Sequence, residues 1–281
     1  MSHDLAVAWR IYPGVSKTPI IHSTDKFQLV KTCLLSFLKS TAGIRIRYYF
    51  ILDGCPDSYH QLIQKLFGEQ SYSVIKTDKI GNLATFALQV DILLKQSEAE
   101  IVYFAEDDYL YKPGQFGKMV NLVRECRDVD FVSCYFTPDI YNHPIHQHQR
   151  ELKRFNDHLW ISDSSTCMTF MTTKKTLQET KNVLLTYSKG NNDCALWLVL
   201  TKTHIYNPVR YLKYFMLKDK ESFNIMKVAV KYSFRYFFSF SRYTLWIPYP
   251  GIGTHLEKGL VIDPQEWIDL AAGTGDAPGR S

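Results

Sequence analysis

The chain has 281 residues, of which 46% are hydrophobic and 22% are charged. This composition is ordinary for a globular protein and excludes a collagen-like, low-complexity or wholly disordered chain. The formal net charge is +5, and the excess of cations lies in residues 205–245, which argues against a general nucleic-acid-binding surface. No uncharged apolar run approaches the ~20 residues of a membrane-spanning helix, and the N-terminus lacks a secretory pattern. We therefore expect a cytoplasmic protein that binds no nucleic acid.

The first 110 residues alternate between strand-like and helix-like segments. We expect strands at 5–12, 46–52, 72–77 and 100–105, and helices that begin near residues 25, 58 and 81. Such alternation predicts an α/β fold with a mixed, mainly parallel sheet flanked by helices. In a sheet of this kind, ligands bind beyond the carboxyl ends of the strands.

The second half is less regular. The pattern predicts helices at 114–126, 174–187 and after 191–193, strands at 129–136 and 166–172, a loop at 137–158, and a frayed polar tail at 271–281. The six cysteines form no C-x-x-C pair, which favours buried free thiols over a zinc site or a disulfide framework.

Acidic side chains follow two of the expected strands. Glu106, Asp107 and Asp108 come directly after residues 100–105, and Asp53 follows residues 46–52. Three adjacent acids repel one another, and a bound divalent cation would relieve that repulsion. A solvated turn is the alternative for 106–108, and a turn-forming Asp is the alternative for Asp53.

Taken together, these features resemble the nucleotide-sugar-binding half of GT-A glycosyltransferases of the family 2 type. The resemblance rests on Asp53 at a strand end, on Gly81-Asn82 opening a helix, and on the E-D-D run in place of a D-x-D motif. It implies that Asp53 contacts the nucleobase, that Glu106 or Asp107 contacts the ribose, and that Asp108 binds Mn²⁺ or Mg²⁺. Arg10, Tyr12 and Asn82 are expected to join the donor-binding set.

Three later motifs extend the resemblance. His255, in the glycine-flanked segment 250–257, resembles a further metal ligand, with a surface His as the alternative. Asp193 resembles the catalytic base that takes the acceptor proton, with a helix N-cap as the alternative. Trp160 and Asp163 are expected to contact the acceptor, since an indole stacks on a sugar ring. For Trp160 the alternative is a place in the core.

The basic segment 205–245 carries twelve Phe or Tyr and eight Lys or Arg, against two acids. A pair of helices covering the sheet is one interpretation. Peripheral contact with the inner face of a membrane is the other.

The resemblance implies a single domain over 1–270, with a nucleotide-sugar half at 1–112, an acceptor half at 113–204 and the basic aromatic part at 205–270. The function it predicts is a metal-dependent, inverting glycosyltransferase of the hexosyltransferase type in glycan or cell-surface polysaccharide synthesis. It would move a sugar from a nucleotide-diphosphate sugar to a glycan, lipid-linked or protein hydroxyl. The alternative is a non-catalytic GT-A-like module that binds a glycan or a membrane surface.

Overall fold

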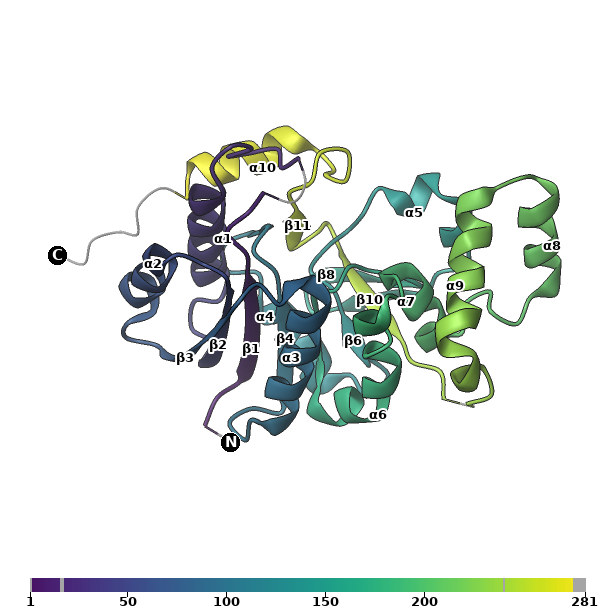
Figure 1. The fold of residues 1–281 in the computed structure, drawn as a ribbon, viewed down its shortest axis with the longest axis horizontal. Helices are drawn as coiled ribbons and strands as arrows, with labels where there is room; N and C mark the ends of the chain where they lie inside the picture. Colours follow the sequence, from purple (N-terminus) through teal and green to yellow (C-terminus); the bar gives the residue numbers. More distant parts are fainter. Residues whose placement is uncertain (1, 16–17, 240, 275–281) are drawn as a thin grey trace.

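The computed structural model describes residues 2–15, 18–239 and 241–274. Its first part contains β1 (Leu5–Ile11), α1 (Lys26–Ser40), β2 (Ile46–Asp53), α2 (Asp57–Phe67), β3 (Ser71–Thr77), α3 (Gly81–Lys95), β4 (Ile101–Ala105), β5 (Tyr109–Tyr111) and α4 (Gly117–Glu125). The expected alternation of strands and helices is confirmed over this part of the chain (Figure 1).

The second part is more irregular. It contains β6 (Phe131–Val132), α5 (Asp139–Asn142), the 3₁₀ helix η1 (Pro144–His146), β7 (Leu152–Phe155), β8 (His158–Asp163), β9 (Phe170–Thr173), α6 (Lys174–Leu184), η2 (Tyr187–Lys189), α7 (Asp193–Thr201), α8 (Pro208–Met216), α9 (Lys220–Phe237), β10 (Leu245–Tyr249), β11 (Gly253–His255) and α10 (Pro264–Ala272).

A nine-stranded sheet forms the centre of the molecule, in the order β3-β2-β1-β4-β9-β6-β10-β8-β7. Strands β3, β2, β1 and β4 are parallel, whereas β9 runs antiparallel to both β4 and β6. The predicted mixed, mainly parallel sheet is therefore confirmed. A second sheet of two strands pairs β11 with β5.

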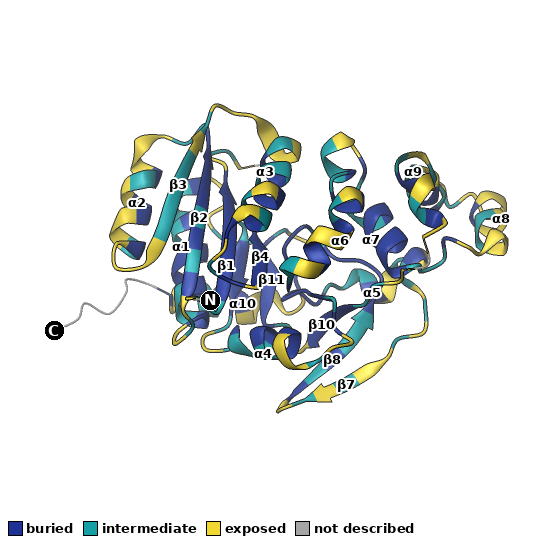
Figure 2. Ribbon diagram, turned by 90° about the horizontal axis from the view of Figure 1, so that it is seen from below, coloured by how far each residue is buried: buried dark blue, intermediate teal, exposed yellow. Residues whose placement is uncertain are grey.

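Strand β1 shows how the sequence builds the two layers of helices. Because side chains alternate across a strand, Leu5, Val7 and Trp9 pack into the cluster with α1, α2 and α4. Ala6 and Ala8 pack into the other cluster, beneath α3. Buried residues line both faces of the central strands (Figure 2), and the two faces support helices on opposite sides.

Four predictions for the second half need correction. The strand expected at 166–172 begins only at Phe170 and is β9. The strand expected at 129–136 shrinks to β6, because the chain then turns away and the carbonyl of Cys134 accepts bonds from Ile252 and Gly253. The expected loop at 137–158 contains α5, η1 and β7. Helix α10 continues to Ala272, two residues into the expected tail, and residues 275–281 lie outside the described residues.

Within the described ranges, the model has no helix that combines the length and apolarity needed to cross a bilayer.

Candidate active site

A cavity of about 510 Å³ opens at the carboxyl edge of the parallel strands. Because β2, β1 and β4 are neighbours in parallel, their C-terminal residues meet at one edge of the sheet. Nine of the eleven site residues predicted from the sequence line this cavity: Arg10, Tyr12, Asp53, Asn82, Glu106, Asp107, Asp108, Asp193 and His255.

Glu106 is held between two strands of the sheet. Its Oε1 accepts a bond of 2.5 Å from Arg10 at the end of β1, and its Oε2 accepts one of 2.7 Å from Thr169, which precedes β9. Arg10 also donates to the backbone carbonyl of Asn82 (2.9 Å) and to its side-chain oxygen. The Asn82 amide in turn donates to the Tyr187 hydroxyl (3.0 Å). One chain of hydrogen bonds therefore joins five residues, of which Arg10, Asn82, Glu106 and Tyr187 line the cavity.

Asp107 is buried and pairs with a lysine that sequence reasoning missed. Lys26, the first residue of α1, donates to Oδ1 at 2.7 Å, and the backbone N–H of Tyr12 donates to Oδ2 at 2.7 Å. Burial raises the pKa of Asp107 to about 6, although Lys26 opposes that rise. Asp107 therefore fixes the loop after β1, and both of its oxygens already accept protein donors.

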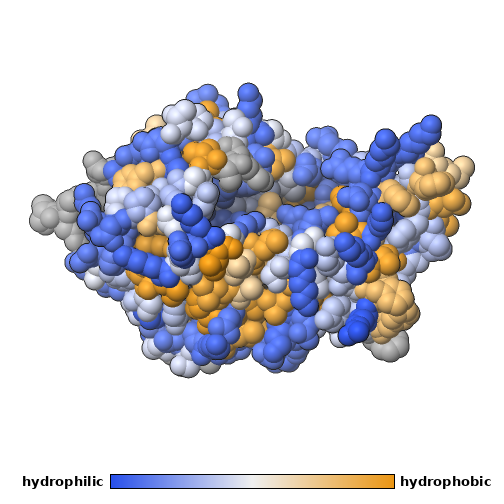
Figure 3. All heavy atoms as spheres, in the orientation of Figure 1, coloured by the Kyte–Doolittle hydropathy of each residue, from blue (hydrophilic) through white to orange (hydrophobic). Residues whose placement is uncertain are grey.

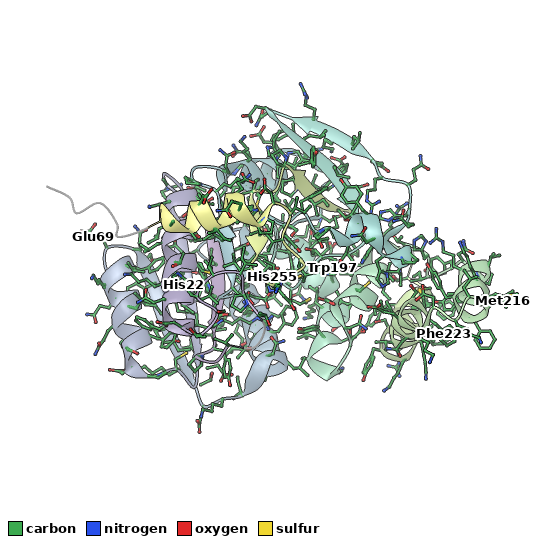
Figure 4. All side chains as sticks on the ribbon, turned by 90° about the horizontal axis from the view of Figure 1, so that it is seen from above. His22, Glu69, Trp197, Met216, Phe223 and His255 are labelled. Carbon is green, nitrogen blue, oxygen red and sulfur yellow. The ribbon has the colours of Figure 1, made fainter. Side chains whose placement is uncertain are left out.

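Asp108 and His255 form the pair predicted to bind a metal. Strand β11 pairs with β5 so that His255 lies opposite Tyr109, the residue after Asp108. The imidazole stacks on the Tyr109 ring, with centroids 5.0 Å apart, and its Nε2 lies 3.1 Å from Asp108 Oδ2. Burial disfavours the imidazolium, but the Asp108 carboxylate outweighs this effect and raises the pKa of His255 well above its usual value. Figure 4 shows His255 near the middle of the molecule, away from its outer edge.

The chemistry of this pair fits a divalent cation. A carboxylate oxygen and an imidazole nitrogen are ligands that Mn²⁺ accepts, and a cation would replace the proton they share. Within the described residues, no group of three or more His, Cys, Asp or Glu side chains is arranged to hold an ion. The protein would therefore supply two ligands and leave the remaining positions to phosphate oxygens, as is common for such cations.

Asp53 both lines the cavity and caps a helix. Helix α3 has no side-chain cap of its own, because Ile80 occupies the N-cap position. The Asp53 carboxylate accepts from the backbone N–H of Ile80 (2.7 Å) and of Gly81 (2.8 Å), and from the Thr77 hydroxyl (2.8 Å). Asp53 thus stabilises the start of α3, and its contact with a nucleobase stays a prediction.

Asp193 follows the N-cap residue of α7, and its Oδ1 also accepts from the first-turn N–H of Cys194 at 2.8 Å. Asn192 is the N-cap of α7, and its side chain accepts from the Ala195 N–H at 2.7 Å. Asp193 occupies the first turn and lines the cavity together with the acids at 106–108.

The two predicted acceptor contacts are not among the residues that line the cavity. Trp160 lies in β8 and is 0% exposed within the core cluster, so its indole cannot stack on a sugar; its core alternative holds. Asp163, at the end of β8, accepts from the Ser164 N–H (2.7 Å) and from Arg150 (3.4 Å). Burial raises the pKa of Asp163 to about 6, against the opposing effect of Arg150.

Several cavity residues gave no signal in the sequence. Lys79, Cys167, Met168 and Tyr187 line the cavity but belong to no motif. Gly54 is the one sequence feature that bears on Lys79. The φ of Gly54 is +66°, and a Cβ atom on this residue would lie 2.3 Å from Lys79 Cγ. The glycine therefore allows the lysine side chain to cross over the turn.

Comparisons with known proteins agree with the predicted resemblance. The model of the family described as Glycosyl transferase family 2 matches residues 20–186, more than half of the chain. No curated protein matches the chain.

Similar solved structures have low sequence identity. Mannosyltransferase PcManGT from Pyrobaculum calidifontis, in complex with GDP-Man and Mn²⁺, is 11% identical with a TM-score of 0.47, over 84% of this chain and 76% of that one. Galactosyltransferase LgtC, in complex with donor and acceptor sugar analogs, is 8% identical with a TM-score of 0.48, over 97% of both chains. TarS from S. aureus is 13% identical with a TM-score of 0.40, over 66% of this chain and 54% of that one.

Proposed function

The chain belongs to glycosyl transferase family 2 and is a glycosyltransferase that uses nucleotide-sugar donors, and we propose that it transfers the sugar, with inversion and with the help of a divalent cation, to a hydroxyl group of an acceptor. The observation that carries this proposal is the shared cavity. Asp193 from α7, the acids after β4 and His255 from β11 line one space of about 510 Å³, although they are far apart in the sequence.

The donor occupies the edge of the sheet in this proposal. Asp53 accepts a hydrogen bond from the nucleobase through a lone pair that its protein donors leave available. The Arg10–Glu106–Asn82 arrangement places the ribose and the first phosphate. Asp108 and His255 would hold Mn²⁺ or Mg²⁺, whose positive charge would stabilise the leaving nucleoside diphosphate.

Asp193 acts on the acceptor. Its carboxylate takes the proton of the acceptor hydroxyl as the hydroxyl oxygen forms a bond to the anomeric carbon. The bond between that carbon and the diphosphate oxygen breaks at the same time, and the leaving group takes the electron pair. Attack from the side opposite the diphosphate inverts the anomeric centre.

Replacing Asp193 with Asn tests the assignment of the base. We expect at least a hundredfold loss of transfer, in line with the usual contribution of general base catalysis of about 10²–10⁴. Donor affinity, measured by calorimetry with Mn²⁺, should stay within about twofold because Asp193 does not contact the diphosphate. The fold should persist, since Asn192 caps the helix.

A matched control is Asp91→Asn, which removes an exposed acid that pairs with Lys95 in α3. It should leave both transfer and donor binding unchanged. Full transfer activity in Asp193→Asn would exclude Asp193 as the base. Loss of donor binding together with transfer would move Asp193 to the donor site.

A further inference from the structure

Helix α8 turns its apolar side away from the protein. Leu212, Phe215 and Met216 are 58–70% exposed, and so is Val209, one turn earlier. The side that packs on the molecule is polar and aromatic: Tyr214 is buried, and its hydroxyl interacts with Arg210. An ordinary surface helix has the opposite arrangement, with its apolar stripe against the core. The exposed apolar side of α8 therefore needs a partner outside the described protein.

Exposed cations lie on both α8 and α9 and in the turn between them. Lys213 of α8 and Lys218 of the turn are exposed. On α9, Lys227, Lys231 and Arg235 recur every four residues and are exposed, which places them along one side of that helix. Residues 205–245 carry eight Lys or Arg against Asp219 and Glu221.

The position of α8 suits a surface contact. Figure 1 shows α8 at one end of the molecule, with α9 between it and the body of the fold. Figure 3 shows hydrophobic atoms at that end, interleaved with hydrophilic ones. In Figure 4, Met216 lies at the outer edge, whereas Phe223 of α9 lies further inward, in ring contact with Phe215 at 5.8 Å. The apolar side chains thus stand on a protruding helix.

We propose that the α8–α9 pair docks on an anionic lipid bilayer, with the outer side of α8 inserted at the level of the headgroups. The apolar side chains supply the area that is buried there, and the exposed lysines and arginines attract the anionic headgroups. A second copy of the chain fits less well, because a twofold contact would bring two cationic surfaces together. This contact goes beyond the transfer reaction and does not depend on it.

Co-sedimentation with vesicles tests the proposal. We expect the protein to pellet with phosphatidylcholine vesicles that contain phosphatidylglycerol, at low salt, and to stay in the supernatant at high salt or with phosphatidylcholine alone. The variant Leu212→Gln/Phe215→Gln/Met216→Gln should lose pelleting, and glutamine keeps good helix propensity. Its control is Leu152→Gln, which removes an equally exposed leucine (68%) from β7 and should pellet normally.

Charge variants test the second part of the proposal. Lys213→Gln/Lys218→Gln should weaken vesicle binding by about fivefold for each cation removed. Replacing Lys65 and Lys175, exposed lysines on α2 and α6, with Gln is the matched control.

Three results would overturn the proposal. The first is no pelleting of the intact protein with phosphatidylglycerol vesicles at low salt. The second is pelleting that survives the triple Gln variant while circular dichroism shows native helix content. The third is concentration-dependent dimerisation in sedimentation velocity that the triple variant abolishes without any vesicle binding, which would assign the surface to a second copy.

Discussion

Replacing Lys26 with Met should destabilise the protein, because it leaves the buried carboxylate of Asp107 without the positive charge that compensates it. The Lys26 and Asp107 side chains are 6% and 11% exposed, and their charged atoms lie 2.7 Å apart. Methionine keeps the length of the side chain but removes the ammonium. Asp107 would then retain the bond from the Tyr12 N–H and lose the charge that compensates its burial.

The size of the effect follows from this geometry. Removing one partner of a buried ion pair costs about 3–5 kcal/mol, because the other charge stays buried without compensation. We expect a loss of about 3 kcal/mol in the free energy of unfolding at pH 8. With an unfolding entropy of about 2.1 cal/mol/K per residue, this corresponds to a fall in Tm of about 5 °C for a chain of this length.

Urea denaturation of the protein without donor or added metal measures this loss. The double variant Lys26→Met/Asp107→Asn should recover most of it, since the amide carries no charge to bury. Lys76→Met is the control: Lys76 pairs with Asp57 at a similar distance of 2.8 Å, but both side chains are more than half exposed. That variant should unfold at the wild-type midpoint. A Lys26→Met variant as stable as the wild type, or a double variant with no recovery, would refute the reasoning.

Three other predictions concern Asp163, Gly54 and Trp160. The pKa of Asp163 is about 6 in the folded protein against about 3.9 unfolded, so the native state binds the proton more tightly. The free energy of unfolding should therefore fall by about 3 kcal/mol as pH rises from 3 to 7, with about 2 kcal/mol of this between pH 4 and 6. Asp163→Asn should reduce the pH dependence by that amount in urea titrations at several pH values. Gly54→Ala should displace the Lys79 side chain and so weaken donor binding severalfold in calorimetry. Because the φ of Gly54 is positive, the same change should also lower the free energy of unfolding by about 1–2 kcal/mol. Trp160→Phe should cost about 2 kcal/mol of stability and leave the acceptor KM unchanged.

Each of these predictions has a contrary result. A pH dependence in Asp163→Asn as steep as that of the wild type would assign the titration to another group, such as Asp107. Gly43→Ala is the control for Gly54→Ala, because its φ is +83° but no atom lies within 4 Å of the added Cβ. Equal donor affinities in the two alanine variants would show that Lys79 does not act on the donor. A raised acceptor KM in Trp160→Phe would place the indole at the acceptor after all.

The first half of the fold was predictable because each of its elements carries a local signal. Strand β1 is an uninterrupted run of buried residues. The helix after it has Asp25 as its N-cap residue, whose side chain accepts a hydrogen bond from the Gln28 N–H at 3.0 Å. Strand β10 carries no such signal, although Leu245 and Trp246 pair with β6 in the same sheet. It follows a basic aromatic helix and contains Pro248, a residue that usually argues against a strand inside a sheet. Proline is tolerated there because β6 ends at Val132 and offers Pro248 no partner.

The residues of the candidate site likewise fall into those that the sequence predicts and those that it does not. Asp53 and the acids at 106–108 were predictable, because parallel strands bring their carboxyl ends to one edge. Lys26 was not, because a lysine in the first turn of a helix ordinarily remains in water, and its partner Asp107 lies 81 residues away. Trp160 was misplaced since the sequence does not say which side of β8 faces the core. Both errors depend on contacts between distant segments, which no local pattern reports.

The hydrogen bonds from Thr169 through Glu106, Arg10 and Asn82 to Tyr187 have a consequence for the kinetics of donor binding. Hydrogen-bonded partners in this set lie up to 105 residues apart in the sequence, and the bonds form within the protein alone. Folding therefore already restricts the rotamers of these side chains. If the donor binds as proposed, its association would bear little of that entropy cost. We would then expect donor binding without a slow rearrangement after the first encounter.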